Sequence, residues 1–154
     1  MNWLTDLLTN PYALTSMSSW FIAQAIKVII TFCVTKKVSV ERMFGDGGMP
    51  SGHSATVSSL AIFTALRCGT GSFEFAVTAI LAIIVCHDAM GVRQEAGKQA
   101  MVINDMVEQF ERLLKQDIVD IDLKELVGHT PLQVLAGITL GVCNAFVMHY
   151  LVFN

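Results

Sequence analysis

Long stretches of the chain carry no charged side chain, and short polar segments separate them. Two such stretches run from Gly47 to Leu66 and from Leu126 to Asn154, and Lys27 is the only charge between Leu7 and Thr35. A helix of about 20 mostly apolar residues is long enough to cross the hydrocarbon core of a bilayer. The pattern therefore predicts four spans, at about 14–34, 50–66, 73–90 and 131–153.

The second predicted span, residues 50–66, is rich in serine, alanine, threonine and glycine rather than leucine. Small side chains let helix backbones approach closely inside a membrane. We therefore expect this helix at the centre of an all-α integral membrane bundle of about four transmembrane helices. The chain, residues 1–154, is predicted to form a single domain.

The segment between the third and fourth spans has a different periodicity. Its apolar residues recur at helical spacing: Val102, Met106, Phe110 and Leu113. Glu108 with Arg112, and Glu111 with Lys115, place opposite charges four residues apart on its polar side. The pattern predicts one amphipathic helix, which packs on the bundle or lies at the membrane surface; a specific protein partner is the alternative.

Composition supports the membrane interpretation, because 53% of residues are hydrophobic and only 15% are charged. The net charge of −3 argues against binding nucleic acid through a basic surface. The four cysteines show no C-x-x-C spacing and are interpreted as small apolar residues rather than metal ligands. We therefore expect no metal and no cofactor, with membrane lipids as neighbours; no oligomeric state follows from the sequence.

Basic residues are distributed unequally between the predicted connections. Eight lie in the first and third connections, which a four-span count places on one side, and only Arg67 lies on the other. Basic residues near span ends favour the cytoplasmic side. The sequence therefore predicts a multi-pass protein of the cell membrane with these two connections in the cytoplasm.

Two predicted helix starts each carry a histidine. Gly45–His53 is a glycine-rich segment in which Pro50 suits a first helical turn and His53 follows in that turn. In the second, Thr130 and Gln133 have the spacing of a capping box, so His129 directly precedes the fourth span. Helix starts present unpaired N–H groups and favour anions such as phosphate.

The span count places both helix starts on one face, with Asp88 and Arg93 at the end of the third span. One imidazole can attack phosphorus and the other can protonate the leaving oxygen, while cations hold the remaining oxygens. The pattern thus indicates phosphoryl transfer. Each residue also has a structural interpretation: interfacial histidines, a helix cap at Gln133, and a membrane anchor at Arg93.

The residues Pro50–His53 match the P-S-G-H motif of the type-2 phosphatidic acid phosphatase superfamily, which includes the vanadium haloperoxidases. Together with Asp88–Arg93 and Gly128–Gly137, they resemble its divergent branch over most of the chain. The resemblance implies that His53 is the general acid and that Ser51 and Gly52 bind phosphate.

The superfamily's nucleophilic histidine begins an H-x-x-x-D motif, and His129 is similar to it, with Gln133 in place of the aspartate. Leu123 stands where the superfamily has an arginine, and Arg93 is the expected substitute. Lys37 and Arg42 resemble the first phosphate-binding motif at a different spacing.

The resemblance implies hydrolysis of a phosphate ester or diphosphate on a lipid-like substrate through a phosphohistidine. The alternative is a non-catalytic membrane protein that binds phosphate or lipid headgroups, or a scaffold. A transporter is a weaker hypothesis because a four-span unit shows no repeated half.

Overall fold

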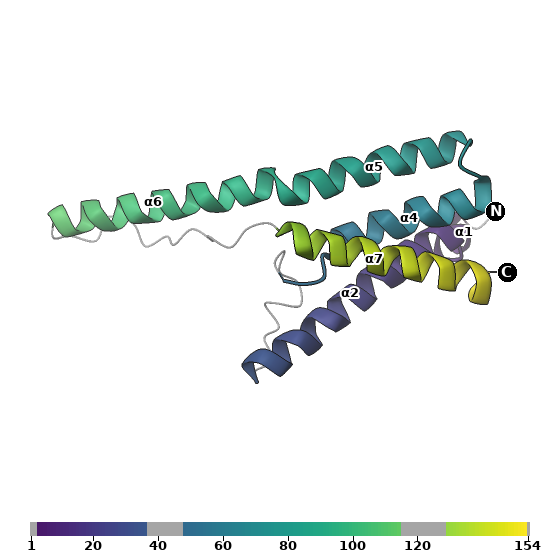
Figure 1. Ribbon diagram of the computed structural model, residues 1–154, viewed down its shortest axis with the longest axis horizontal. Helices are drawn as coiled ribbons and strands as arrows, with labels where there is room; N and C mark the ends of the chain where they lie inside the picture. The colour runs from purple at the N-terminus through teal and green to yellow at the C-terminus, as the bar shows by residue number, and fades with distance from the viewer. Residues whose placement is uncertain (1–2, 37–47, 115–128, 154) are drawn as a thin grey trace.

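The computed structural model describes residues 3–36, 48–114 and 129–153, and every regular element in these ranges is helical. The elements are α1 (Trp3–Leu8), α2 (Pro11–Thr35), α4 (Gly52–Cys68), α5 (Phe73–Met90), α6 (Val92–Leu114), α7 (Pro131–Val147) and a terminal π-helical turn, η1 (Met148–Val152). Figure 1 shows α2, α4, α5 and α7 as a bundle, with both termini at one end. The prediction of an all-α membrane bundle is confirmed.

Helix α4 occupies the centre of the bundle, as its small residues predicted, and packs on α2, α5 and α7. Two glycines of α7 make the closest approach possible. A Cβ atom at Gly137 would lie 2.4 Å from the Ser51 carbonyl oxygen, and one at Gly141 would lie 2.3 Å from that of Ala55. Since real Cβ atoms do not approach that closely, these positions accept glycine alone at this helix separation.

Three helical segments are long and apolar enough to cross a membrane: Pro11–Thr35, Phe73–Leu114 and Pro131–Val152. Helix α4 is shorter, with 17 residues that rise about 25 Å. It is also the most enclosed, because its serines face neighbouring helices, whereas the isoleucines of α5 are exposed on the outside of the bundle. The second predicted span, residues 50–66, is thus a short central helix among longer apolar segments.

The expected start of this central helix needs a correction. The sequence places Pro50 in the first helical turn, but α4 begins at Gly52 and Pro50 precedes it. The reason is that Ser51 takes the N-cap position, where its hydroxyl oxygen accepts a hydrogen bond from the Ser54 backbone N–H. His53 is then the second residue of the helix.

Helix α6 continues α5 in nearly the same direction and extends beyond the other helices (Figure 1). The predicted amphipathic helix therefore exists; of the two placements expected for it, packing on the bundle is not observed among the described residues, and lying at the membrane surface stays a prediction. Its apolar residues Val102, Met106, Phe110 and Leu113 are each more than half exposed, because α6 follows the axis of α5 away from α4 and α7. The Glu108–Arg112 ion pair is present, while Lys115 lies outside the described residues.

A buried polar contact joins α7 to α2 toward the end of the bundle where α2 begins. The Asn144 Nδ2 atom lies 3.1 Å from the Thr15 carbonyl oxygen and 2.9 and 2.8 Å from the hydroxyls of Ser18 and Ser19. An amide in an apolar environment must find such acceptors inside the protein. Asn144 therefore fixes the position of α7 along α2.

Candidate functional site

The two histidines at the helix starts lie next to each other. Helices α4 and α7 begin at the same end of the bundle, and the ring centroids of His53 and His129 are 6.4 Å apart, with planes inclined by 58°. His53 is exposed, whereas His129 is only 3% exposed. One imidazole thus faces the surroundings and the other lies within the protein.

Backbone hydrogen bonds between separate helices hold these starts in place. The Ser51 N–H donates to the Gln133 carbonyl oxygen at 3.0 Å, which joins the start of α4 to the first turn of α7. The His129 N–H donates to the Ala89 carbonyl oxygen, also at 3.0 Å, which joins the residue before α7 to the last turn of α5. Three helices therefore determine where the two imidazoles lie.

Gln133 forms the capping box that the sequence predicted and also reaches the buried imidazole. Its Oε1 atom accepts from the Thr130 N–H at 3.1 Å and lies 3.2 Å from Nδ1 of His129. Because an amide oxygen can only accept, Nδ1 must carry the hydrogen of that second bond. The lone pair of the neutral His129 ring is then on Nε2.

Ser51 and Ser54 form the floor of the site. Both side chains are fully buried, and the Ser54 hydroxyl donates to the Ser51 hydroxyl oxygen at 3.0 Å. Ser51 Oγ also accepts the capping bond from the Ser54 N–H. With its oxygen occupied as an acceptor, the Ser51 hydroxyl has its own hydrogen left to donate.

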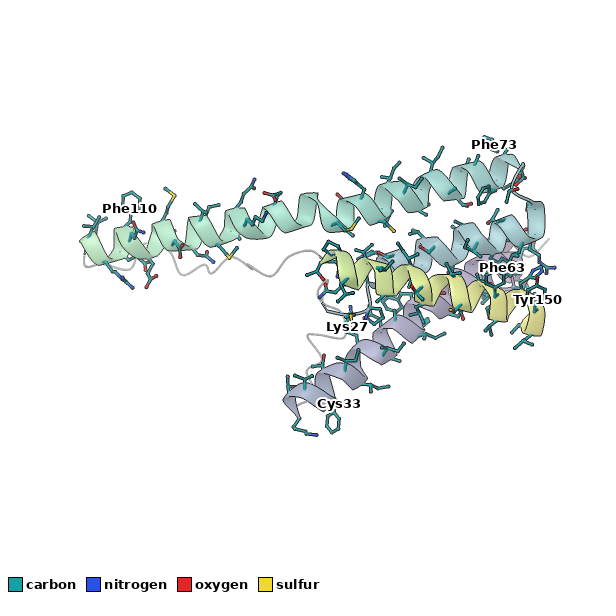
Figure 2. All side chains as sticks on the ribbon, in the orientation of Figure 1. Lys27, Cys33, Phe63, Phe73, Phe110 and Tyr150 are labelled. Carbon is teal, nitrogen blue, oxygen red and sulfur yellow. The ribbon has the colours of Figure 1, made fainter. Side chains whose placement is uncertain are left out.

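Lys27 of α2 is a residue of this site that the sequence reasoning missed. It is only 4% exposed, and its aliphatic chain lies against the segment leading into α4 (Figure 2). A Cβ atom at Gly48, whose φ is +94°, would lie 3.3 Å from Lys27 Cγ and Cδ. The available signal was a single charge in an otherwise apolar helix, which typically marks a functional position in a membrane protein.

Trp20 and Gln24 extend the same face of α2 along the start of α4. A Cβ atom at Gly52 would meet Trp20 Cδ1 at 3.3 Å and Gln24 Nε2 at 3.6 Å. These two side chains, with Lys27, are spaced three and four residues apart and so project from one side of the helix. The glycines at 48 and 52 make room for them.

The structure describes the remaining predicted site residues only in part. Asp88 lies half-buried in the last turn of α5, next to the Ala89 carbonyl that binds His129. Arg93 is the second residue of α6, and its side chain is outside the described part of the structure. Lys37, Arg42 and Leu123 also lie outside the described residues.

The donor set suits an anion better than a metal ion. Within residues 3–36, 48–114 and 129–153, no group of three or more histidine, cysteine, aspartate or glutamate side chains is arranged to hold a metal. At the start of α4 lie instead a helix N-terminus and a serine hydroxyl, which donate hydrogen bonds to oxygen, and the Lys27 side chain packs on the segment that leads to this start.

Comparisons with known proteins identify the family of this chain. The family model described as "Divergent PAP2 family" matches residues 8–144. The Bacillus subtilis (strain 168) protein named "Uncharacterized membrane protein YuiD" is 42% identical over 154 residues, covering 94% of this chain and 98% of that protein. No solved structure matches the chain. With three apolar helices of spanning length, it is an integral membrane protein in contact with lipids, and it belongs to the divergent PAP2 family.

Proposed function

We propose that the protein is a metal-independent membrane phosphohydrolase that removes a phosphoryl group from a lipid-like phosphate ester or diphosphate. The observation that carries this proposal is the pairing of His53 and His129, 6.4 Å apart between ring centroids, at two helix starts. The Lys27 side chain, buried against the segment that leads into α4, supports it, because a phosphoryl group brings negative charge that an ammonium group can stabilise.

In the first step, Nε2 of His129 attacks phosphorus. A nitrogen–phosphorus bond forms, the bond from phosphorus to the leaving oxygen breaks, and His53 gives its proton to that oxygen. The alcohol or the shorter phosphate leaves, and the phosphoryl group stays on His129. The tautomer set by Gln133, with hydrogen on Nδ1, supports attack by Nε2.

In the second step, water attacks the phosphohistidine. An oxygen–phosphorus bond forms, the nitrogen–phosphorus bond breaks, and His53, now neutral, accepts the water proton. Inorganic phosphate leaves, and both histidines return to their starting states. His53 is exposed, so the leaving group and the water can reach it from outside the bundle.

The remaining candidates stabilise the transferred group. The backbone N–H groups after Ser51, including that of Gly52, and the Ser51 hydroxyl point toward a phosphoryl oxygen at the helix start. Lys27 contributes a positive charge from α2. Arg93, Lys37 and Arg42 are proposed as further phosphate-binding cations, and Asp88 as a partner that orients one of these charged groups.

A non-catalytic headgroup-binding protein is the second candidate, and Gln133 is the observation that favours it. A carboxylate at this position would stabilise the imidazolium that forms when His129 is charged, whereas an amide carries no compensating charge. Binding of a phosphate headgroup needs the helix start and Lys27 but no activated nucleophile.

We place the substrate's headgroup on the cytoplasmic side, following the distribution of basic residues along the chain. Single cysteines at Ser39 and Gln116, in a variant lacking the four native cysteines, test this orientation in intact cells. An impermeant thiol reagent should leave both unlabelled and should label a cysteine at Thr70. The reverse pattern would place the site on the outer face.

The decisive experiment measures phosphate release from a panel of lipid phosphates by purified protein in nanodiscs. His129→Ala should abolish release. His87→Ala is the matched control, because His87 is an exposed histidine in the last turn of α5 with no part in the proposed mechanism. Binding without release by the wild type would support the headgroup-binding protein instead.

A further inference from the structure

Gln24 holds an oxygen atom that needs a partner. Its Oε1 is buried from solvent and accepts no hydrogen bond from any residue in the described part of the chain. Buried acceptors in folded proteins are nearly always paired, and each exception calls for an explanation. A ligand that donates a hydrogen bond at this point is one such explanation.

The position of Gln24 connects this oxygen to the phosphate site. Gln24 lies on α2 three residues before Lys27, and its amide packs over Gly52 at the start of α4. Lys27 in turn packs on Gly48, in the segment that leads to Gly52. The Gln24 amide, which carries the unpaired oxygen, thus lies beside the helix N-terminus that is proposed to bind a phosphoryl group.

Its neighbours in the site all have the opposite hydrogen-bonding character. The Trp20 indole N–H, the backbone N–H groups of the helix start and the Ser51 hydroxyl each donate hydrogen bonds. A fully deprotonated tetrahedral anion has only acceptors and satisfies these donors, but it offers nothing to Gln24 Oε1. An anion that carries one hydroxyl satisfies both kinds of group.

Building on the proposed function, we propose that Gln24 is a specificity-determining residue whose side-chain oxygen accepts a hydrogen bond from the P–OH group of a protonated terminal phosphoryl group. A phosphomonoester or the end of a diphosphate can carry this hydroxyl. A phosphodiester has no such group, and neither does sulfate. The substrate class narrows accordingly to terminal phosphates.

A comparison of inorganic phosphate with sulfate tests this role of Gln24. The two anions have similar shape, and only phosphate carries a proton at neutral pH. Isothermal titration of the full-length protein in nanodiscs, at pH 7 and constant ionic strength, measures both dissociation constants. The wild type should bind phosphate about tenfold more tightly than sulfate, the ratio expected of one added hydrogen bond.

Gln24→Met removes the acceptor while nearly keeping the side-chain volume, and it should lower this ratio to about two or less. Gln99→Met makes the same chemical change on an exposed position of α6 and should keep the wild-type ratio. Gln24→Glu keeps an acceptor but adds negative charge. It should weaken binding of both anions and still favour phosphate, which gives a second test if Gln24→Met does not fold.

Three outcomes would overturn the proposal: equal binding of the two anions by the wild type, an unchanged ratio in Gln24→Met, or loss of the ratio in Gln24→Glu. In each of these cases the anion site itself would still exist. Binding of neither anion by the wild type would have a wider meaning, since it would remove both the Gln24 assignment and the phosphate site on which the proposed function depends.

Discussion

At the end of the bundle where α4 and α7 begin, two histidine rings lie with their centroids 6.4 Å apart, and Lys27 is buried against the segment that leads into α4. At the opposite end, where α4 finishes, Phe63 is fully buried and contacts another histidine, His149, with ring centroids 6.1 Å apart. The Arg67 guanidinium there lies 5.7 Å from the centre of the Phe63 ring. Both ends therefore combine imidazole with a cation, yet their surroundings differ.

The difference lies in what the polar groups contact. At the far end, His149 and Arg67 pack on an aromatic ring, an arrangement that stabilises helix packing through aromatic and cation–π contacts. At the site, the polar groups contact one another through hydrogen bonds instead: Ser54 binds Ser51, and the Gln133 amide binds the His129 ring. Residue type alone does not mark a functional end; the neighbouring groups do.

The largest effect should come from removing one histidine at each end. His129→Ala should lower phosphate release at least about 10³-fold, because the proposed nucleophile is lost. His149→Ala should leave kcat within about twofold and lower Tm, because it removes packing against Phe63. Turnover assays and thermal unfolding of both variants check this. A loss of activity in His149→Ala at a temperature where it is folded would contradict the division between the two ends.

A smaller effect should follow from a substitution that pushes α4 and α7 apart. Gly141→Ala places a Cβ against the Ala55 backbone and should cost about 1–3 kcal/mol of stability, as overpacking usually does. Gly71→Ala is the control, because no atom lies within 4 Å of the Cβ it would add. Denaturation in mixed micelles measures both. Equal stability of the two variants would show that α7 can shift away from α4 without cost.

Replacing the polar contact between α2 and α7 should have a still smaller effect. Asn144→Leu loses the hydrogen bonds to Thr15, Ser18 and Ser19, and interhelical hydrogen bonds in membranes contribute about 0.6 kcal/mol on average. The same denaturation assay applies, with Thr139→Val as a control on the exposed side of α7. A destabilisation of several kcal/mol would mean that Asn144 stabilises the bundle through more than these hydrogen bonds.

The smallest change is expected at Gln133. Gln133→Glu should preserve or modestly raise phosphate release, because a carboxylate still accepts from His129 and also stabilises its imidazolium form. Stability should change little, since glutamate serves equally well in a capping box. Steady-state kinetics and Tm measure the two effects. A collapse of the rate in a folded variant would require a different role for this side chain.

Features that depend on residues close together in the chain could be predicted from the sequence. The Thr130–Gln133 capping box is one example, because its two hydrogen bonds join residues three positions apart. The position of Pro50 was predicted wrongly for an equally local reason, since Ser51 competes for the helix cap and takes it. Local chemistry thus accounts for both the success and the error.

The contacts made by Lys27 and Gln24 could not be predicted in the same way. Both residues approach the start of α4 only after two helices pack together, and no local spacing encodes that approach. The direction of α6 is a similar case. The third span was predicted at 73–90, and α5 does end at Met90, but a second helix begins at Val92 along nearly the same line.

The hydrogen bond from the His129 N–H to the Ala89 carbonyl has a mechanical consequence. Ala89 is in the last turn of α5, and α6 extends that helix by 23 residues, or about 35 Å. A rotation of α5 and α6 together about Ala89 moves Leu114 much farther than the residues next to Ala89. The reverse also holds: a force applied near Leu114 produces a large torque at Ala89, whose carbonyl oxygen binds the His129 N–H.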